Sequence, residues 1–465
     1  MEEEKPKKKR KKAPIKREPS SSLEMAEREE TRPKVKKAAE ESEKEHKKPW
    51  QEKYASPEEI ETFLNDHIYL RRNVVTLRTE WREPSSYESD GNEKWEPIND
   101  WKLNTLWKKM AKEKPVIFDH MKKVINSDSF PDFHPFCFYL EHLPPWDHKN
   151  DYILEMSLSV SVKGGVEEQM RFAEYLRKWL VAMVAGWVDE REVNHVILIF
   201  IGEQGIYKTT WLDSLIPPEL EQYLSKQTST DRLDKDEQLR ATEFALINMD
   251  EIDKMGDREL NAMKSLITAT DVNVRAPYGT GKERYVRLAS YVASGNKDRF
   301  LTDNTGNRRW LPFNVERIDS PYQNKLPYAG MYAQALYLYQ HGYSYWFDLD
   351  QIHGMSQHVN EFMVESMEEQ LIPVYYEPAK PNDVDSIFLT VAEISSHLIS
   401  LGNIKKPMDI RSLGIAMKKL GFQCKRDGKL RTRGYIVREK NASEIEQTHK
   451  QMAMEELPLQ GDLPF

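Results

Sequence analysis

The chain has 465 residues, a formal net charge of −8 and two cysteines, Cys137 and Cys424, that lie far apart in sequence. This length suits two or three domains of roughly 100 to 200 residues each, and two distant cysteines argue against a disulfide framework and a paired-cysteine metal site. No stretch supplies the roughly 20 uncharged apolar residues of a membrane span, so we expect a soluble, cytoplasmic protein with no membrane partner.

The first part of the chain is charged and then aromatic. Residues 1–49 are rich in Lys, Glu, Ser and Pro, which predicts a disordered arm. Its basic cluster Lys7–Lys12 either contacts nucleic acid, resembles a nuclear import signal or only raises solubility. Residues 50–154 predict a small α/β or mostly helical module, with helices and one strand over these ranges: Pro57–Asn65, Asn73–Arg82 (the strand), Trp101–Met110 and Val116–Ile125.

A strand followed by a glycine-containing turn organises the middle of the chain. After an amphipathic helix predicted over Glu167–Val188, six apolar residues, Val196–Ile201, predict a central strand covered on both faces. The next residues have the spacing of a phosphate-binding loop: Gly202, Glu203, Gln204, Gly205, Ile206, Tyr207, Lys208, Thr209 and Thr210. In such a loop backbone N–H groups face the β-phosphate, Lys208 reaches the β and γ oxygens, and Thr209 ligates Mg²⁺.

This loop departs from the common pattern at one position. Tyr207 stands where a glycine usually precedes the lysine. A tyrosine keeps the backbone donor but requires an allowed φ and space for its ring, so we expect a slightly reshaped loop. The alternatives are an ordinary strand–turn–helix corner, or a loop that Tyr207 blocks and that serves only as a scaffold.

A pair of carboxylates follows the next predicted strand. Phe244–Met249 predicts an apolar strand, and Asp250 and Glu251 come directly after it. Behind a phosphate-binding loop, Asp250 is placed to hold Mg²⁺ through water and Glu251 to orient or deprotonate the attacking water. The sequence therefore predicts nucleotide hydrolysis.

Basic and amide residues follow in the same region. Residues 273–278 and 284–288 flank a basic tip and predict a hairpin. Leu288–Ser294 predicts a strand before Asn296, whose amide either holds the lytic water or only forms a turn. Arg308 and Arg309 precede an apolar strand, which suits an arginine finger that reaches the γ-phosphate of a neighbouring subunit.

The last part of the chain predicts a helical segment, about 321–381, and then a winged helix. Helices are predicted over Thr390–Leu401 and Asp409–Leu420, and a hairpin over Phe422–Arg438. This module either contacts DNA phosphates or binds protein, and its basic residues are Arg411, Lys418, Lys419, Lys425, Arg426, Lys429, Arg431 and Arg433. The tip Asp462, Leu463, Pro464 and Phe465 resembles the tail of bacterial single-stranded DNA-binding proteins, which docks on replication partners, or is a frayed end.

Taken in order, these motifs resemble the virulence-associated protein E (VirE) family, AAA+-type ATPases similar to superfamily 3 helicases and to the helicase half of phage and plasmid primase-helicases. The resemblance runs from about Glu155 to Phe313 and is carried by Gly202–Thr209, Phe244–Asp253, Val274–Gly279, Ala293–Asn296 and Thr302–Trp310. Some members carry a primase ahead of the ATPase. The region before Glu155 lacks a carboxylate triad and a zinc-ribbon pattern, so we expect no primase activity.

The resemblance implies a role for each matched residue. Lys208 and Thr209 would form Walker A, Asp250 and Glu251 Walker B, Asn296 sensor 1, and Arg308 or Arg309 the finger. The hairpin would be a DNA-gripping pore loop, with Lys282 as the main contact beside Arg275 and Arg284.

We therefore expect an α/β fold with a P-loop AAA+-type core, a mostly helical N-terminal module and a C-terminal winged helix. The expected parts are a disordered arm (1–49), the N-terminal module (50–154), the ATPase domain (155–319), a helical connector (320–385), the winged helix (386–440) and a flexible acidic tail (441–465). The leading functional hypothesis is a homohexameric, ATP- and Mg²⁺-dependent helicase of a phage, plasmid or integrated element, acting on single-stranded or forked DNA. The rival is a nucleotide-switched initiator or regulator that binds DNA without unwinding it.

Overall fold

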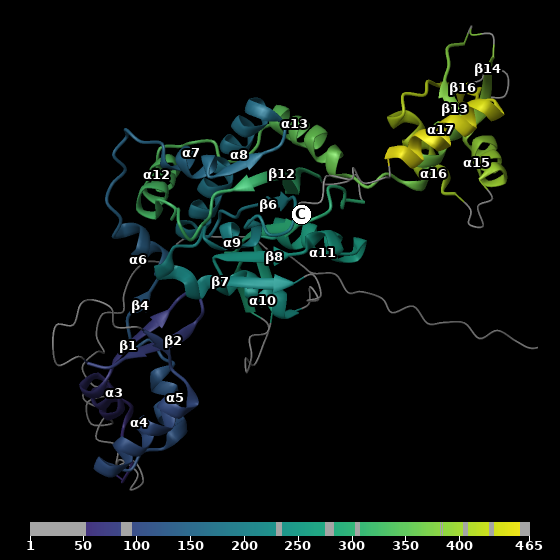
Figure 1. Ribbon diagram of the computed structural model, residues 1–465. Coiled ribbons are helices and arrows are strands. Elements are labelled where there is room, and N and C mark those ends of the chain that lie inside the picture. The colour runs from purple at the N-terminus through teal and green to yellow at the C-terminus, as the bar shows by residue number, and fades with distance from the viewer. Residues whose placement is uncertain are drawn as a thin grey trace, which may run out of the picture. The chain divides into compact units, whose positions relative to one another are not determined.

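The computed structural model describes residues 53–84, 95–228, 235–274, 283–302, 307–381, 383, 385–402, 408–426 and 432–455 (Figure 1). The chain divides into two compact units, one from Met1–Tyr69 and Asn99–Ser129, the other from Leu70–Ile98 and Phe130–Phe465. The fold is mixed α/β, as the sequence predicts. The predicted arm over residues 1–49 and the tip over residues 462–465 lie outside the described residues.

The first unit consists of three helices. These are α3 (Pro57–His67), α4 (Asp100–Glu113) and α5 (Phe118–Ile125), so the three helices predicted in this region are confirmed. Ser56 and Asn99 cap the first two helices through hydrogen bonds to backbone N–H groups three residues on. The apolar face of each helix is buried among the others.

The strand predicted over Asn73–Arg82 is confirmed only for its second half, because the chain turns back within the predicted range. The structure has β1 (Tyr69–Asn73) and β2 (Arg78–Arg82) in a small sheet that also contains β3 (Glu96–Pro97) and β4 (Asp132–Phe133). The Asn73 side chain accepts hydrogen bonds from the N–H groups of Val75 and Thr76, and Leu77 adopts a φ of 54°. These local bonds to asparagine stabilise a turn where the alternating pattern indicated continued extension.

A six-stranded sheet forms the centre of the second unit. Its order is β5-β12-β6-β11-β8-β7; the strands from β12 to β7 are parallel, and β5 pairs antiparallel with β12. The strand bounds are β5 Val160–Val162, β6 Ile197–Ile201, β7 Leu224–Thr228, β8 Leu246–Asp250, β11 Ser290–Gly295 and β12 Trp310–Ile318. The predicted central position of the strand before the loop is thereby confirmed.

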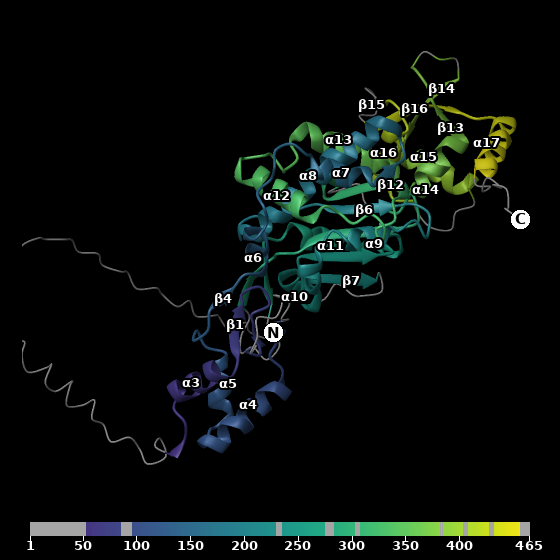
Figure 2. The same cartoon turned by 60° about the vertical axis from the view of Figure 1, so that its left-hand side comes forward.

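Both faces of this sheet are covered, which explains why β6 has no polar residue. Leu198 and Phe200 belong to one buried cluster, together with side chains of α8 (Gly165–Val188) and α12 (Tyr328–Gln340). The alternate residues of β6 belong to a second cluster, which contains the apolar face of α11 (Asp257–Thr268). Figure 2 shows α7 (Tyr152–Leu158), α8 and α12 grouped beside one another.

Shorter elements surround this core. They are α6 (Pro135–Glu141), α9 (Lys208–Asp213), η1 (Pro218–Tyr223), α10 (Lys235–Glu243), η2 (Ile252–Lys254), η3 (Asn307–Arg309), α13 (Leu349–Val359) and η4 (Asn360–Phe362). The predicted hairpin is present as the antiparallel pair β9 (Asp271–Val274) and β10 (Glu283–Val286), while its tip lies outside the described residues.

The C-terminal elements form a layer of helices on a small antiparallel sheet. The predicted helices are present as α15 (Val391–Leu401) and α16 (Ile410–Lys419), and Asp409 caps the latter as expected. The predicted hairpin strands are β15 (Cys424–Arg426) and β16 (Arg433–Glu439), and β16 also pairs with β13 (Tyr376–Pro378) and β14 (Ser386–Thr390). Buried side chains between these layers include Ile394, Leu413, Met417 and Val437.

Two expectations for this region need correction. The segment assigned to a connector supplies α14 (Met367–Tyr375), which packs against α16, and also supplies β13. The tail expected to be flexible from residue 441 begins with a helix, α17 (Ala442–Glu455). Asn441 accepts a hydrogen bond from the N–H of Glu444, whose carboxylate pairs with Arg438, so a cap and an ion pair stabilise the first turn.

Candidate functional site

The candidate site lies where three neighbouring parallel strands end. In the sheet register Gly295 of β11 is paired with Ile201 of β6, and β8 ends at Asp250 on the other side of β11. The loops that follow these strands therefore meet at one edge of the sheet, the carboxyl edge, where open α/β sheets bind ligands.

The turn after β6 requires its two glycines. A Cβ atom on Gly202 would lie 2.5 Å from the carbonyl oxygen of Val315, which leaves no room for a side chain. Gly205 has a φ of +88°, a conformation that glycine adopts without strain. The turn then leads into α9, which begins at Lys208, as the sequence predicts.

The Lys208 ammonium lies at the centre of this turn. Its Nζ donates hydrogen bonds to the carbonyl oxygens of Gly202 (2.8 Å) and Glu203 (2.5 Å) and to Oδ1 of Asn296 (3.1 Å). Burial lowers the pKa of Lys208, and the carboxylates of Asp250, Asp253 and Glu203 oppose that shift. A buried cation held by neutral oxygens is suited to an anionic ligand, whose charge compensates the desolvation.

A hydroxyl and carboxylate chain connects α9 to β8. The Thr209 hydroxyl lies 3.0 Å from the Ser294 hydroxyl, which donates to Oδ1 of Asp250 at 2.6 Å. Thr209 itself lies 3.4 Å from the same carboxylate oxygen. The structure thus brings together the predicted Lys208, Thr209, Asp250 and Asn296.

Two further polar residues at this edge were not predicted. Ser294, the hydroxyl residue just before the predicted Gly295–Asn296 turn, bridges Thr209 and Asp250. Asp253, three residues after Asp250, has a buried Oδ1 with no hydrogen-bond partner among the described residues; it lies 3.0 Å from where a Cβ of Gly295 would be. The run of acidic residues after β8 could have identified Asp253 as a site residue from the sequence. Ser294 could be identified only from the register of the strands in the sheet.

Glu251 is at the same edge but points to a different partner. Its backbone adopts a φ of 58°, and its carboxylate forms an ion pair with Lys254. That pair is partly exposed, with 38% of the Glu251 side-chain surface accessible. The carboxylate is therefore within the loop cluster and is free to exchange Lys254 for water at little cost, because exposed ion pairs contribute only about 0–1 kcal/mol.

Tyr207 takes a conformation that favours glycine. Its φ is 69°, and its ring is 42% exposed and lies edge-on to the ring of Tyr322, with centroids 6.2 Å apart. The expected reshaping is not seen at this residue: the left-handed backbone keeps the conformation that a glycine would adopt, and the ring lies against Tyr322. The ring does not interrupt the hydrogen bonds of the Lys208 ammonium.

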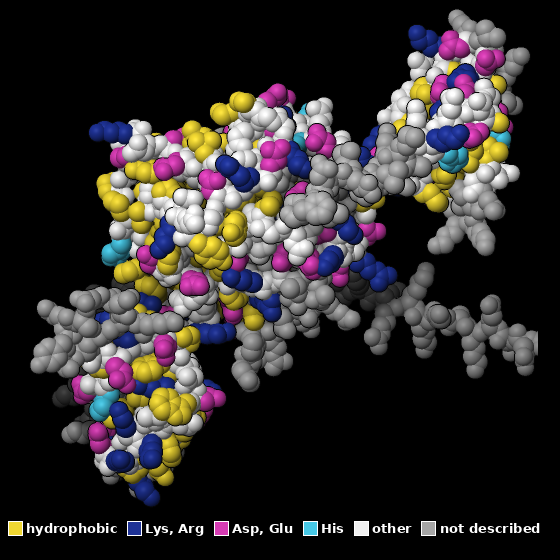
Figure 3. Space-filling view, in the orientation of Figure 1, with side chains coloured by type: hydrophobic (Ala, Val, Ile, Leu, Met, Phe, Trp, Pro, Cys, Tyr) yellow, Lys and Arg dark blue, Asp and Glu magenta, His cyan; other side chains and the backbone are white. Residues whose placement is uncertain are grey.

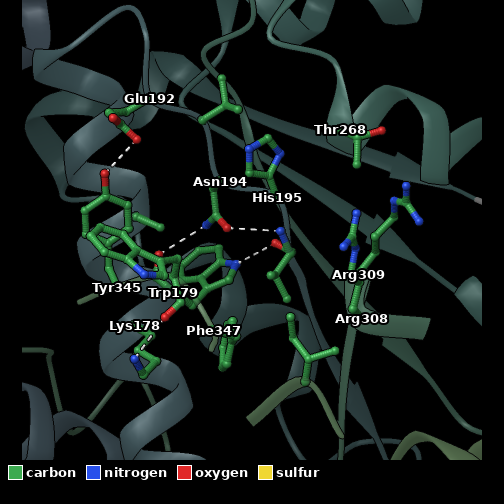
Figure 4. A pocket seen from close by; sticks show the side chains of 15 residues that line it. Lys178, Trp179, Glu192, Asn194, His195, Thr268, Arg308, Arg309, Tyr345 and Phe347 are labelled. Carbon is green, nitrogen blue, oxygen red and sulfur yellow. Dashed lines mark hydrogen bonds between the residues drawn. The ribbon is translucent and has the colours of Figure 1, made fainter. Parts of the chain in front are cut away.

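The two predicted arginines lie at the opposite edge of the sheet. Arg308 and Arg309 precede β12, whose first residue, Trp310, is paired with Ile197 at the start of β6, whereas the turn follows the end of β6. They line a cavity of about 530 Å³ and face Lys178, Trp179 and Tyr345 across it (Figure 4). The structure therefore does not bring the arginines together with Lys208 within one chain.

Positively charged side chains line the part of this cavity near Arg308 and Arg309. His195 also lines it, and burial lowers the pKa of its imidazole, as do the charges of Arg287 and Arg308. Burial, followed by the charge of Arg308, lowers the pKa of Arg309. Arg308 itself is exposed.

The predicted DNA-binding residues are only partly described. Arg275, Lys282 and Arg431 lie outside the described residues. Arg284 on β10 pairs with Asp271, and Lys419 on α16 pairs with Glu369, each at 2.8 Å. Lys418 and Arg433 are exposed. In Figure 3 the C-terminal elements carry Lys and Arg side chains mixed with Asp and Glu, so that face has no patch of one charge sign.

Two searches of the described residues gave negative results. None of the helices in the described ranges combines the length and the apolar composition that crossing a membrane requires. Within the same ranges, no three or more His, Cys, Asp or Glu side chains are gathered as metal ligands. A divalent cation at the carboxyl edge would therefore need further ligands from a phosphate or from water, as Mg²⁺ commonly takes.

Comparison with known proteins supports a resemblance over the middle of the chain. No curated protein matches the sequence. Among solved structures, an apo structure of the NrS-1 C-terminal region has 10% identity and a TM-score of 0.44, covering 82% of this chain and 98% of that one. An A form of the same apo region has 11% identity and a TM-score of 0.42, with the same coverage. Residues 141–364, which contain the whole carboxyl-edge cluster and both arginines, match the family described as the virulence-associated protein E-like domain.

Proposed function

We propose that the chain is an ATP-driven DNA helicase or translocase built on a P-loop AAA+-type core similar to superfamily 3 helicases, and that it acts in replication of a phage or mobile element. The observation that carries the proposal is the convergence of Lys208, Thr209 and Asp250 at the carboxyl edge of a parallel sheet. The match to the virulence-associated protein E-like domain over residues 141–364 supports it.

In this proposal the turn after β6 receives the triphosphate. The Lys208 ammonium exchanges its carbonyl partners for β and γ oxygens, and Thr209 and Asp250 hold Mg²⁺. Hydroxyl and carboxylate oxygens are hard donors that suit this ion, and the unpartnered oxygen of Asp253 adds a further acceptor beside them. The bound ion would neutralise developing phosphate charge.

The attacking water would be positioned by Glu251 and Asn296. Glu251 follows Asp250 directly, and its exposed ion pair with Lys254 leaves the carboxylate able to accept a proton from water. Asn296 contacts Lys208 at 3.1 Å, so its amide lies beside the amine that would bind the γ-phosphate. It is therefore suited to sense whether that phosphate is present.

The arginines favour action between subunits. Arg308 and Arg309 lie at the edge of the sheet opposite Lys208, so they are unable to reach the triphosphate of their own chain. In a homohexamer they would contact the γ-phosphate held by the neighbouring copy and stabilise charge in the transition state. The β9–β10 hairpin, with Arg275, Lys282 and Arg284, would grip single-stranded or forked DNA.

A second candidate is a nucleotide-switched initiator or regulator that binds DNA and does not unwind it. The order of α15, α16, β15 and β16 favours it, because two helices followed by a strand pair is the arrangement of a winged helix. Exposed Lys418 and Arg433 are available for phosphate contacts, with Arg431 between β15 and β16 in sequence. The tip 462–465 would engage replication partners in either case.

The first experiment measures ATP hydrolysis with and without single-stranded DNA. We expect hydrolysis by the wild-type chain, loss in Lys208→Ala, and loss of about 100-fold or more with retained nucleotide binding in Glu251→Gln. Stimulation by DNA together with strand separation supports the helicase, whereas DNA binding without stimulation or separation supports the regulator. A wild-type chain that neither binds nor hydrolyses ATP contradicts both.

A mixing experiment tests the arrangement between subunits. Lys208→Ala chains and Arg308→Ala/Arg309→Ala chains are each expected to be inactive alone, and mixing them should restore part of the activity. Restoration requires that an intact turn meets intact arginines from another copy. Arg317→Ala, on the strand β12 that follows the two arginines and 75% exposed at its side chain, is the matched control and should behave as wild type. Full activity of a monomeric preparation would contradict the arrangement.

A further inference from the structure

Tyr207 combines backbone strain with an exposed ring. Its φ of 69° is left-handed, one of four such non-glycine residues in the described part of the chain. For an L-residue with a side chain this conformation is strained, whereas glycine adopts it freely. A tyrosine at a position that glycine fills at no cost suggests that the ring has a use there.

The ring lies in an aromatic pair at the rim of the phosphate turn. Tyr322, which follows β12, is 74% exposed and meets the Tyr207 ring edge-on, at 79° and 6.2 Å between centroids. An edge-on contact covers at most one face of one of the two rings, and the high exposure of Tyr322 leaves ring surface available to a partner. Large aromatic surface normally avoids water unless a partner covers it, and aromatic faces stack with nucleobases of any kind.

The aromatic pair lies beside Lys208, the residue proposed to bind the phosphates of a nucleotide. Tyr207 is bonded directly to Lys208, the predicted phosphate ligand, and Tyr322 comes from the segment after β12, the strand next to β6 in the sheet. The Lys208 ammonium remains bonded to Gly202 and Glu203, so the Tyr207 ring does not fill the phosphate side of the turn. A base attached to phosphates bound at Lys208 has to leave the turn past its rim.

We propose that Tyr207 and Tyr322 form the base-binding part of the nucleotide site, with the base of a nucleoside triphosphate stacked on the exposed face of Tyr322 and its edge against Tyr207. This inference rests on the proposed function and deepens it. Stacking recognises the area of a base rather than its hydrogen-bond pattern, so purine triphosphates bind more tightly than pyrimidine ones, and ATP and GTP bind similarly.

The test compares ATP with inorganic tripolyphosphate, which has phosphates and no base. In the full-length chain, Tyr322→Ala and Tyr207→Gly are each expected to weaken ATP binding by about 10-fold and to leave tripolyphosphate binding unchanged, the size of one lost stacking contact. Tyr322→Phe and Tyr207→Phe keep the rings and should bind ATP as the wild type does. Titration calorimetry with each ligand gives the dissociation constants.

The outcomes separate this inference from the proposed function. ATP binding that is unchanged in both ring-deleting variants overturns the inference, as does equal weakening of ATP and tripolyphosphate, which would mean that the rings only support the turn. In either case the wild-type chain still binds ATP, so the proposed function stands. A wild-type chain that binds neither ligand overturns both.

Discussion

Arg287 is a fully buried guanidinium that binds four backbone carbonyls from three segments of the core, and replacing it with methionine tests how much these bonds stabilise the fold. Its nitrogens donate to the carbonyl oxygens of Ala269 (2.7 Å), Ala289 (2.5 Å), Asn194 (2.9 Å) and Ile267 (2.9 Å). These carbonyls belong to the end of α11, the residue after it, and the residues that precede β6 and β11.

The expected loss of folding free energy in Arg287→Met follows from two opposing contributions. Four hydrogen bonds from a charged donor stabilise the fold by roughly 6 kcal/mol, taking the lower measured value of about 1.5 kcal/mol each. Burial lowers the pKa of Arg287 to about 10 from 12.5, which corresponds to about 3 kcal/mol of desolvation that methionine would remove. The difference predicts that Arg287→Met destabilises the core by about 3 kcal/mol, the low end of the range for disrupted buried charges.

Urea unfolding, monitored by tryptophan fluorescence, measures this loss of folding free energy. Four tryptophans, at positions 179, 187, 211 and 310, are fully buried in the core and report its unfolding. Arg284→Met is the control, because that arginine lies on β10, three residues before Arg287, with its side chain 73% exposed, and exposed pairs contribute about 0–1 kcal/mol. A loss below about 1 kcal/mol in Arg287→Met would refute the reasoning, since four orphaned carbonyls would then cost almost nothing.

The remaining predictions concern the turn and the C-terminal elements. Gly202→Ala should abolish measurable nucleotide binding, because its Cβ would lie 2.5 Å from the Val315 carbonyl; Gly256→Ala, with its nearest neighbour at 3.7 Å, should bind normally. Nucleotide affinity should fall as pH rises toward the lowered pKa of Lys208, below the ordinary 10.5, because only the protonated amine binds phosphate; Lys208→Arg should show no such fall in binding assays up to that pH. Tyr435→Phe should cost the C-terminal elements about 1 kcal/mol in thermal unfolding, because its hydroxyl donates to a carbonyl of α16 at 2.9 Å.

Elements whose stability is local or whose burial is complete were predictable from the sequence. β6 is buried on both faces, so its apolar run has one interpretation. The helix α16 begins directly after Asp409, the aspartate cap that the sequence predicts. The break between β1 and β2 was not predictable from alternation, because an asparagine side chain forms the turn. The helix α17 was missed because its composition is polar and its packing comes from distant elements.

The site was predictable in its motifs and not in its geometry. Spacing identified Lys208, Thr209 and Asp250, because loop chemistry is local in sequence. Ser294 depends on which strand lies next to β6, and sheet order is set by packing between residues far apart in the chain. The same limit applies to Arg308, whose distance from the turn follows from strand direction.

The location of the turn and the arginine pair at opposite edges of one sheet restricts how copies could associate. In a two-fold dimer residue i of each copy meets residue j of the other, so both turns would meet both arginine pairs only if turn and arginines share one surface of the chain. If they lie on different surfaces, a head-to-tail contact is needed, and such contacts either close into a ring or continue without limit. In a closed arrangement every chain would both give and receive an arginine, whereas an open row would always end in one copy with an incomplete site.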